Sequence, residues 1–138
     1  MARLIPYLQF TGNCREAMGF YRGCLGGELE IQTFGESPMG EGMSTEMKNL
    51  VLHSALNSDT MVLMASDSMQ GQKPNAGGAV TLCLNTDEAE ELKAIFTRFS
   101  VGATITQPLK EEFFGWYGAL TDQYGIGWMF QSGGAPSA

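Results

Sequence analysis

His53 is the only histidine in the chain, so any imidazole-based proton transfer must use it. It follows an apolar run, residues 50–52, that is typical of a strand. Two interpretations remain open: a hydrogen-bonded histidine with a structural role on a sheet face, and a ligand contact or general base inside a cavity. Sequence spacing alone supports no Ser-His-Asp triad around His53.

Two adjacent carboxylates, Glu111 and Glu112, precede a dense aromatic stretch that ends at Tyr117. Neighbouring residues of a strand point to opposite faces, so at most one of these glutamates enters a cavity. A carboxylate beside aromatic walls would act as an acid or base with a raised pKa, or as a clamp for a cationic ligand. A solvated strand edge explains the same pattern. Phe114 and Trp116 are expected to line the core or a cavity.

Other polar side chains admit either a structural or a functional role. Gln9 lies two residues after Tyr7 and therefore on the same strand face, where its amide is a ligand contact or merely an exposed polar group. Cys14 lies near a predicted helix start, and the N-terminus of a helix lowers the pKa of a nearby thiol. Its position in the apolar stripe of that helix favours burial instead. Asp67 and Asp122 stand beside turns, and capping or turn roles are predicted for both.

These residues must be positioned by elements that occur twice along the chain. Residues 7–16 run from an apolar strand pattern into a helix start, and residues 81–90 do so again 74 positions later (87 − 13 = 74). Each stretch contains a pattern typical of a capping box, Asn13 with Glu16 and Asp87 with Glu90. Two copies of one plan indicate two modules, with a binding site between them.

Periodicity predicts two tandem β-α-β-β-β modules within a single domain. The first covers about residues 1–66 and the second about 79–132, joined by a linker with Gly and Pro at about 67–78. The predicted helices follow the two capping pairs, and the predicted strands are 4–10, 28–34, 50–56, 60–65, 79–85, 103–109, 113–121 and 126–131. Neither module easily buries its own sheet face, so we expect an α+β fold whose curved mixed sheet surrounds a cavity.

Residues 35–48 form a long connection, rich in Gly, Ser, Glu and Met, without clear periodicity. Connections of that length inside a domain tend to be functional or mobile. Because Met39, Met43 and Met47 are spaced by four, a short helical lid, a dimer contact and a plain surface loop are all open alternatives.

Composition narrows the possible partners. The 138 residues carry a formal net charge of −7 and only 8 Lys and Arg, which argues against nucleic acid. No apolar run approaches the ~18 residues of a membrane span and no signal-peptide pattern is visible, so we expect a cytoplasmic protein without a membrane partner. The cysteines lack Cys-x-x-Cys spacing and are expected to be reduced thiols: Cys14, Cys24 and Cys83.

Six ordered segments together resemble a known family. They are Pro6-Tyr7-Leu8 with residues 12–17 and 20–21, then 53–56, 64–67, 111–115, 121–125 and Trp128-Met129. In this order they resemble the PhnB-like branch of the vicinal-oxygen-chelate superfamily, which includes glyoxalase, bleomycin-binding proteins and extradiol dioxygenases. The resemblance implies a glyoxalase/bleomycin resistance/dioxygenase-like fold and a homodimer. It also favours Glu111 over Glu112 as the cavity carboxylate.

Superfamily enzymes hold a divalent metal with His, Gln or Glu from the first and last strand of each module. By resemblance, those positions fall here at Pro6 or Tyr7, Met64, Val80 or Thr81, and Met129. Hard divalent cations take carboxylate oxygen or imidazole nitrogen, whereas thioethers suit soft ions such as Cu(I). We therefore expect no metal and no cofactor, and expect Tyr7, Met64 and Met129 to line an apolar cavity.

The resulting prediction is a protein that binds a small organic molecule in this cavity. The expected ligand contacts are Tyr7, Gln9, Met64, Phe114, Trp116 and Met129, with His53 and Glu111 as the groups able to move a proton. One alternative is a lyase, isomerase or oxygenase of the superfamily, with or without a metal; another is a partner-binding dimer without a ligand. Members of the branch are also labelled 3-demethylubiquinone-9 3-methyltransferase domains, yet no Gly-rich loop follows a strand to bind S-adenosylmethionine.

Overall fold

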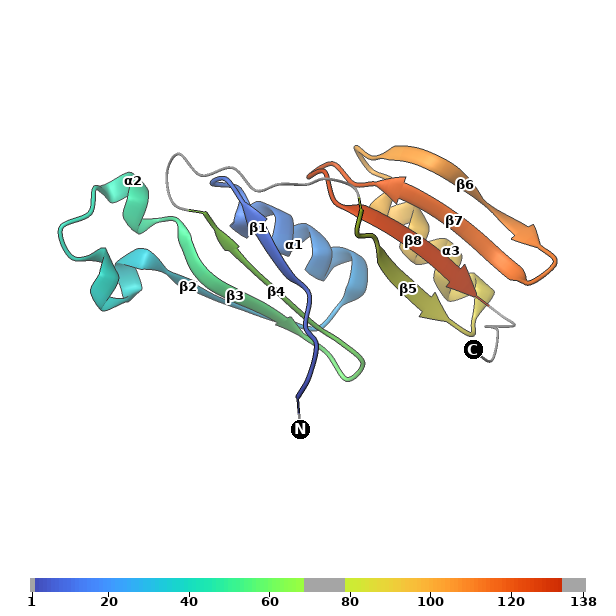
Figure 1. Ribbon diagram of the computed structural model, residues 1–138, viewed down its shortest axis with the longest axis horizontal. Coiled ribbons are helices and arrows are strands. Elements are labelled where there is room, and N and C mark those ends of the chain that lie inside the picture. The colour runs from blue at the N-terminus through green and yellow to red at the C-terminus, as the bar shows by residue number, and fades with distance from the viewer. Residues whose placement is uncertain (1, 69–78, 133–138) are drawn as a thin grey trace. The chain divides into compact units, whose positions relative to one another are not determined.

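The computed structural model describes residues 2–68 and 79–132, and the chain divides into two compact units (Figure 1). Unit 1 comprises residues 1–75 and unit 2 comprises residues 76–138. Each unit contains one four-stranded mixed sheet and follows the order strand, helix and three strands. The predicted α+β class and the predicted order of the main elements are therefore confirmed.

The sheet of unit 1 has the strand order β1-β4-β3-β2, with β1 parallel to β4 and the other neighbours antiparallel. Its elements are β1 (Tyr7–Phe10), α1 (Cys14–Leu25), β2 (Glu28–Thr33), β3 (Val51–Asn57) and β4 (Val62–Asp67). The predicted linker, 67–78, lies outside the described residues from 69 onward, and Asp67 belongs to β4.

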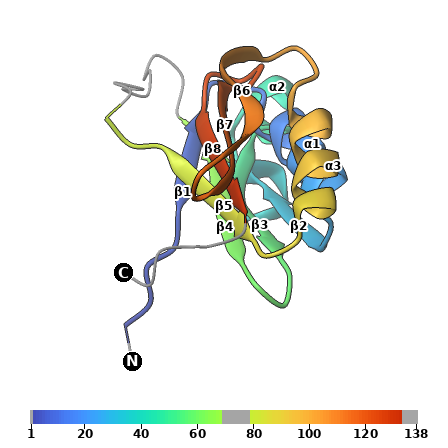
Figure 2. The ribbon, with the colours of Figure 1, turned by 90° about the vertical axis from the view of Figure 1, so that its right-hand side faces the viewer.

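Helix α1 covers one face of this sheet (Figure 2). Its buried residues recur every three or four positions, as expected of an amphipathic helix: Cys14, Ala17, Met18, Tyr21 and Cys24. On the strands, buried side chains of the same face include Phe10, Ser54, Leu56, Leu63 and Ala65. We call this side the helix face of unit 1, and the opposite, more exposed side its open face.

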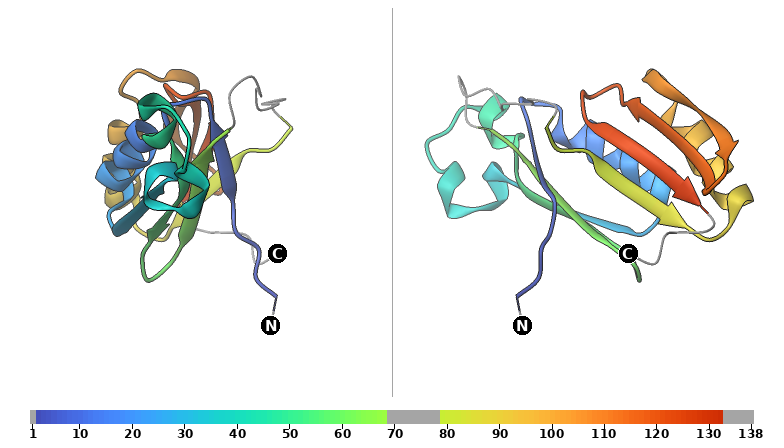
Figure 3. Two further views of the ribbon diagram at one scale, coloured as in Figure 1. Left: turned by 90° about the vertical axis from the view of Figure 1, so that its left-hand side faces the viewer. Right: turned by 45° about the vertical axis from the view of Figure 1, so that its right-hand side comes forward.

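The sheet of unit 2 repeats this plan with the strand order β5-β8-β7-β6 and helix α3 against one face (Figure 3). Its elements are β5 (Leu82–Thr86), α3 (Ala89–Phe99), β6 (Thr104–Glu112), β7 (Gly115–Thr121) and β8 (Gly127–Ser132). Aromatic rings form its core: the Phe99 ring centroid lies 4.6 Å from that of Trp128 and 5.4 Å from that of Phe130. The side that α3 covers is the helix face of unit 2, and the opposite side is its open face.

The predicted capping boxes are wrong at both helix starts. Asn13 is the N-cap of α1, but its side chain makes no capping hydrogen bond. The amide of Cys14 instead donates to the carboxylate of Asp67, 53 residues away in sequence. In unit 2 the N-cap is Glu88, one residue beyond Asp87, again without a side-chain cap. A distant carboxylate therefore replaces the local cap in unit 1, and a local pattern cannot reveal such a partner.

The long connection of unit 1 folds into three short helices, η1 (Phe34–Glu36), η2 (Pro38–Gly40) and α2 (Thr45–Lys48). Pro38 and Gly42, with φ at 86°, interrupt any continuous helix, so the methionines spaced by four do not share one. The roles as a lid or a dimer contact stay predictions. Among the residues that the structure describes, no helix is long and apolar enough to cross a membrane.

Candidate functional site

The open face of unit 1 brings four of the predicted site residues together. Pairing between neighbouring strands arranges the side chains of one face in rows across the sheet. One complete row is Glu30, Ala55, Met64 and Tyr7, and on the same face beside it lie two pairs, Gln32 with His53 and Ser66 with Gln9. The sequence alone indicates four residues of this face: Tyr7, Gln9, His53 and Met64. The strand register adds Gln32, Glu30 and Ser66, for which the sequence contains no signal.

Tyr7 and His53 form a hydrogen-bonded and stacked pair on this face. The Tyr7 hydroxyl lies 3.1 Å from Nδ1 of His53, and which group donates depends on the imidazole tautomer. The ring centroids are 5.8 Å apart, with 28° between the ring planes. Tyr7 is 46% exposed and belongs to β1, whereas His53 belongs to β3, so the pair spans the intervening strand β4. A phenol and an imidazole are thus presented at the surface, outside the core.

A β-bulge stands immediately before His53. Gln32 pairs with His53, but the next residue of β2, Thr33, pairs with Val51, so Leu52 is an extra residue in β3. The bulge lets Val51 lie in the core, 1% exposed, although His53 two positions later lies on the open face. Bulges commonly re-aim side chains beside functional sites. The apolar run before His53 contains no sequence signal for this irregularity.

Asp67, the last residue of β4, is a buried carboxylate that accepts three backbone hydrogen bonds. Its Oδ1 accepts from the amides of Gly12, at 2.8 Å, and Cys14, at 3.0 Å. Its Oδ2 accepts from the amide of Val51 at 2.9 Å. The predicted capping or turn role is therefore confirmed and extends further, because the same carboxylate also reaches β3.

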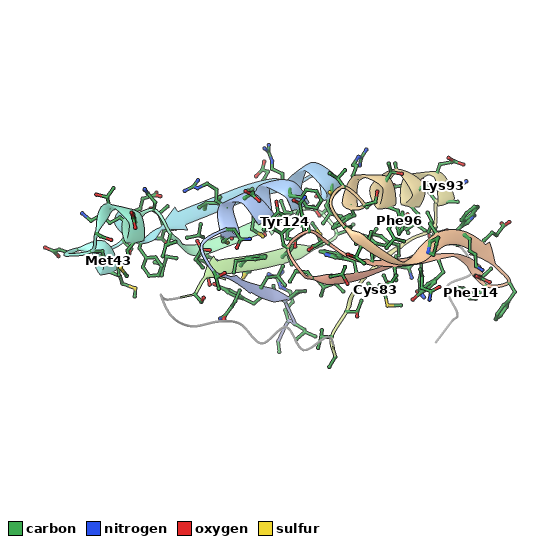
Figure 4. The ribbon with its side chains drawn as sticks, turned by 90° about the horizontal axis from the view of Figure 1, so that it is seen from above. Met43, Cys83, Lys93, Phe96, Phe114 and Tyr124 are labelled. Atoms are coloured by element: carbon green, nitrogen blue, oxygen red, sulfur yellow. The ribbon has the colours of Figure 1, made fainter. Side chains whose placement is uncertain are left out.

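The open face of unit 2 carries two corresponding rows with other side chains. They are Lys110, Tyr117, Gln131 and Asn85, and then Gln107, Ala119, Met129 and Cys83. The Cys83 thiol lies 3.8 Å from Oε1 of Gln131, and burial raises the pKa of this thiol. Cys83 and Lys93 lie on opposite sides of the sheet (Figure 4). Both open faces therefore present a phenol, a thioether and amides, but that of unit 2 adds a thiol and an ammonium group and lacks the imidazole of unit 1 among its described residues.

Two predicted site residues of unit 2 lie on the other side of its sheet. Glu111 pairs with Trp116, and Nζ of Lys93 on α3 lies 4.3 Å from the centroid of a Trp116 ring. Glu111 and Trp116 therefore belong to the helix face. Glu112, two residues after Lys110 and 3.5 Å from its Nζ, belongs to the open face. This register follows from the tight turn before Gly115, at φ 124°, and places the two glutamates opposite to the expectation from resemblance.

Phe114 lies in that turn between β6 and β7. Its ring centroid is 6.2 Å from that of Tyr117, in an edge-to-face arrangement, and 5.1 Å from that of Phe113. Phe113 is fully exposed. Phe114 thus extends the open face of unit 2 toward the tip of the hairpin, and its role as a ligand contact stays a prediction.

Almost the whole chain matches one sequence family. The model of the family described as 3-demethylubiquinone-9 3-methyltransferase matches residues 2–131. The chain belongs to this PhnB-like family. Protein YjdN of Escherichia coli strain K12 is 32% identical over 136 residues, which cover 91% of this chain and 92% of that protein.

Solved structures confirm the fold of this PhnB-like protein. Protein PA1353 from Pseudomonas aeruginosa superposes with a TM-score of 0.85 at 32% identity, covering 96% of this chain and 98% of that one. A PhnB protein from Bacillus cereus gives 0.73 at 23% identity, covering 95% and 99%. A glyoxylase/bleomycin resistance protein/dioxygenase domain from Frankia gives 0.63 at 16% identity, covering 96% and 98%. The fold is therefore that of the vicinal-oxygen-chelate superfamily.

One of the expected metal positions must be corrected. Cys83 pairs with Met129 in unit 2 as Tyr7 pairs with Met64 in unit 1, whereas Val80 and Thr81 precede β5. The two sheets are thus related by 76 positions at the first strand (83 − 7 = 76), not by 74. Two features account for the difference of two positions. The connection from β1 to α1 has three residues, whereas that from β5 to α3 has two. Helix α3 also begins one residue later than the cap pattern predicts.

The positions that the resemblance assigns to a metal therefore hold Tyr7 and Met64 in unit 1, and Cys83 and Met129 in unit 2. Hard divalent cations prefer carboxylate oxygen or imidazole nitrogen, and a thiol binds a metal only after it loses its proton. Two thioethers, a phenol and a thiol with a raised pKa do not provide such a ligand set. Within residues 2–68 and 79–132, no group of three or more His, Cys, Asp or Glu residues is placed to hold a metal ion. The residues present do not fit the superfamily's metal.

The remaining cysteines have no exposed surface to offer a ligand. Cys14 is fully buried, with Sγ 3.6 Å from Oγ of Ser54. Burial raises the pKa of Cys14 to about 11, against a smaller lowering by its hydrogen bond to Ser54. Cys24 is also buried, and all three cysteines are free thiols. The predictions of reduced cysteines and of a structural Cys14 are confirmed.

Proposed function

We propose that this protein binds a small organic molecule on the open face of unit 1, with Tyr7 and His53 as its polar contacts. The supporting observation is the exposed pair itself, a phenol and an imidazole 3.1 Å apart on the face opposite to the one that α1 covers. The stability of the fold does not require such a pair, because the core lies on the helix face. Exposed polar and aromatic groups held in a fixed geometry are typical of recognition sites.

The surroundings of the pair supply a mixed polar and apolar surface. Nδ1 of His53 faces Tyr7, and Nε2 makes no hydrogen bond to any described residue, so it is available to a ligand. Met64 is next to Tyr7 in the sheet and offers a polarizable apolar contact. Gln32 pairs with His53, and Gln9 lies on the same face two residues after Tyr7, so both amides are on the open face. The proposed ligand therefore has a planar or apolar body and at least one hydrogen-bonding group.

A second candidate is proton transfer, by a lyase, isomerase or oxygenase. It is favoured by the contact between the Tyr7 hydroxyl and the His53 imidazole, since such a pair can take a proton from a substrate and hold it. His53 would be the general base and Tyr7 the group that orients its ring. The candidate assigns no step to Glu111, which lies on the helix face of unit 2.

Methyl transfer is not part of the proposal. The turn after β1 contains a single glycine, Gly12, and its amide already donates to Asp67. The turn after β5 is Asp87-Glu88, without glycine. Neither turn offers the run of free glycine amides that binds the charged part of a nucleotide-like cofactor at a helix start.

The homodimer implied by the superfamily resemblance is also part of the proposal. It is supported by large hydrophobic side chains left exposed, among them Val101, Ile105 and Phe113. Sedimentation equilibrium of the full chain measures this directly: a mass near twice 14.9 kDa is expected, and a monomer at all concentrations would overturn this part of the proposal.

Ligand binding is tested by native mass spectrometry of protein purified from cell extract and by thermal-shift screening of a small-molecule library. We expect a retained mass or a raised melting temperature for the wild type, and its loss in Tyr7→Phe and His53→Ala. Tyr124→Phe, the same chemical change in a turn of unit 2, is the matched control and should behave as wild type. If neither retention nor any thermal shift is found, the binding proposal is wrong.

Proton transfer is distinguished from binding alone by solvent exchange. Compounds that raise the melting temperature are incubated with the protein in D2O, and deuterium beside a carbonyl is measured by NMR. Incorporation that requires His53 supports the enzyme. Binding without incorporation leaves a ligand-binding protein.

A further inference from the structure

We infer that Asp67 is the positioning residue of the Tyr7–His53 pair. The role of the pair in binding rests on the proposed function, whereas the hydrogen bonds of Asp67 do not depend on it. Asp67 is 5% exposed, and its carboxylate accepts hydrogen bonds from both chain segments that carry the pair. One carboxylate thus ties β1 and β3 to β4, the strand that lies between them.

The first connection fixes the strand that carries Tyr7. Phe10, the last residue of β1, pairs with Asp67 in the sheet, and Oδ1 of Asp67 accepts from the amides of Gly12 and Cys14 just beyond. Hydrogen bonds to a charged acceptor are stronger than those between neutral groups. These bonds fix the end of β1 and the start of α1 relative to β4. They therefore also fix the position of Tyr7 along the sheet.

The second connection fixes the bulge that precedes His53. Continued in register, the ladder would pair Thr33 with Leu52; it pairs Thr33 with Val51 instead. Oδ2 of Asp67 accepts from the Val51 amide at 2.9 Å, at the point where the ladder is irregular. A slip of one residue exchanges the two faces of a strand, so this acceptor keeps Val51 in the core and His53 on the open face.

Among the described residues of unit 2 there is neither a phenol–imidazole pair nor a carboxylate at the position of Asp67. The residue of unit 2 at that position is Ser132, because Met129 corresponds to Met64 (132 − 67 = 129 − 64 = 65). A serine hydroxyl is too short and has too few acceptor sites to join three amides on two strands. Asp122, the other buried aspartate of the described residues, accepts hydrogen bonds from its own turn and from β8: the amides of Tyr124 and Ile126, and Nε1 of Trp128.

These two aspartates provide a matched pair of variants. Asp67→Asn keeps one carbonyl oxygen, which serves the Gly12 and Cys14 amides, and turns an NH2 group toward the Val51 amide, so it breaks the connection to β3. Asp122→Asn removes an equally buried carboxylate that accepts from three donors within unit 2. Tyr7→Phe gives the reference state in which the hydrogen bond of the pair is absent.

The measurement is the long-range 1H–15N NMR spectrum of His53, which is unambiguous because the chain has one histidine. It is recorded on the ligand-free full chain. We expect Asp67→Asn to move the Nδ1 and Nε2 resonances at least halfway to their positions in Tyr7→Phe, and Asp122→Asn to leave them at their wild-type positions. Wild-type resonances in a folded Asp67→Asn variant, or equal shifts in both aspartate variants, would overturn the inference.

Hydrogen exchange of the wild type keeps the inference testable if Asp67→Asn does not fold. The Val51 amide should be protected as strongly as those of Gly12 and Cys14, because one buried carboxylate accepts all three. Free exchange at Val51 would contradict it. Since no ligand is needed, failure of every library compound to bind would overturn the proposed function and leave this result unaffected.

Discussion

The two units have the same sheet and helix plan, yet only some positions of that plan carry the same residues. Met64 and Ala55 of unit 1 correspond to Met129 and Ala119 of unit 2, in the same row of each open face. These repeated small and thioether side chains belong to the architecture. A residue that both units share is therefore a poor guide to the chemistry of either.

The positions that differ hold the groups that form hydrogen bonds. Tyr7 is replaced by Cys83, His53 by Tyr117 and Asp67 by Ser132. The three replaced residues are those that form and position the pair in unit 1, and they change together. The comparison teaches that the phenol–imidazole pair is particular to unit 1, whereas the corresponding positions of unit 2 hold a thiol and a phenol without an imidazole.

The largest expected effect tests whether the helix face, and not the open face, stabilises a unit. Phe99→Ala should lower the free energy of unfolding by about 3–5 kcal/mol, because it removes a fully buried ring that contacts Trp128 and Phe130. Urea unfolding followed by fluorescence measures it. Tyr117→Ala on the open face is the control and should cost clearly less; an equal loss would show that the open face is part of the core.

A smaller loss of stability is expected from a substitution that tests how closely α3 packs on its sheet. Gly118 of β7 corresponds to Ser54 of β3, and a Cβ at Gly118 would lie 3.0 Å from a Phe96 ring carbon and 3.0 Å from Cα of Leu109. Gly118→Ser should therefore lower the free energy of unfolding by about 1–3 kcal/mol through overpacking. Ala119→Ser, one residue along on the open face, should change it little. A neutral Gly118→Ser would mean that α3 adjusts without cost.

The sequence predicted the elements well because each has a periodic signal of its own. The buried stripe of α1, at Cys14, Ala17, Met18 and Tyr21, is the pattern that amphipathicity predicts. The sheet register was less predictable, since it depends on turn geometry at Gly115 and on a bulge at Leu52. Those two features decide on which face Glu111, Trp116 and His53 lie.

The site was therefore predictable in its residues more than in its geometry. Tyr7 and His53 were singled out separately, but nothing in their spacing of 46 residues indicated a mutual hydrogen bond. The role of Asp67 was visible only as proximity to a turn. Contacts between residues far apart in sequence come from strand order, and a single chain read residue by residue contains no direct record of that order.

The reactivity of the three thiols tests the difference between the buried helix face of unit 1 and the exposed open face of unit 2. Cys83 on the open face should be alkylated by iodoacetamide in the folded protein at pH 8, whereas Cys14 and Cys24 should react only after unfolding, because both are buried. The pKa of Cys14, about 11, leaves on the order of one thiolate in a thousand at that pH. Peptide mass spectrometry identifies the labelled cysteine, and Cys83→Ser should abolish labelling of the native state. Rapid native labelling of Cys14 would contradict the burial of α1.

The raised pKa of Cys14 also predicts a pH dependence. The folded-state value, about 11, exceeds the ordinary 9.0, so the unfolded chain releases this proton first as the pH rises. The contribution of Cys14 to stability is complete below pH 9.0 and is lost as the pH rises toward 11. Cys14→Ala should therefore flatten the decline of the unfolding free energy between those pH values, measured by urea titration. Parallel curves for the two proteins would show that Cys14 titrates alike in both states.

The smallest expected effect decides between the two interpretations of His53. Tyr7→Phe removes only the hydroxyl of a half-exposed pair, and a single hydrogen bond contributes about 0.5–1.5 kcal/mol even where water is excluded. We therefore expect a loss of at most about 1 kcal/mol in the free energy of unfolding, together with the loss of ligand. A structural histidine would show the reverse, a large loss of stability with ligand binding retained. Because the bond lies on the open face, its contribution to folding is small and its geometry is free to serve recognition.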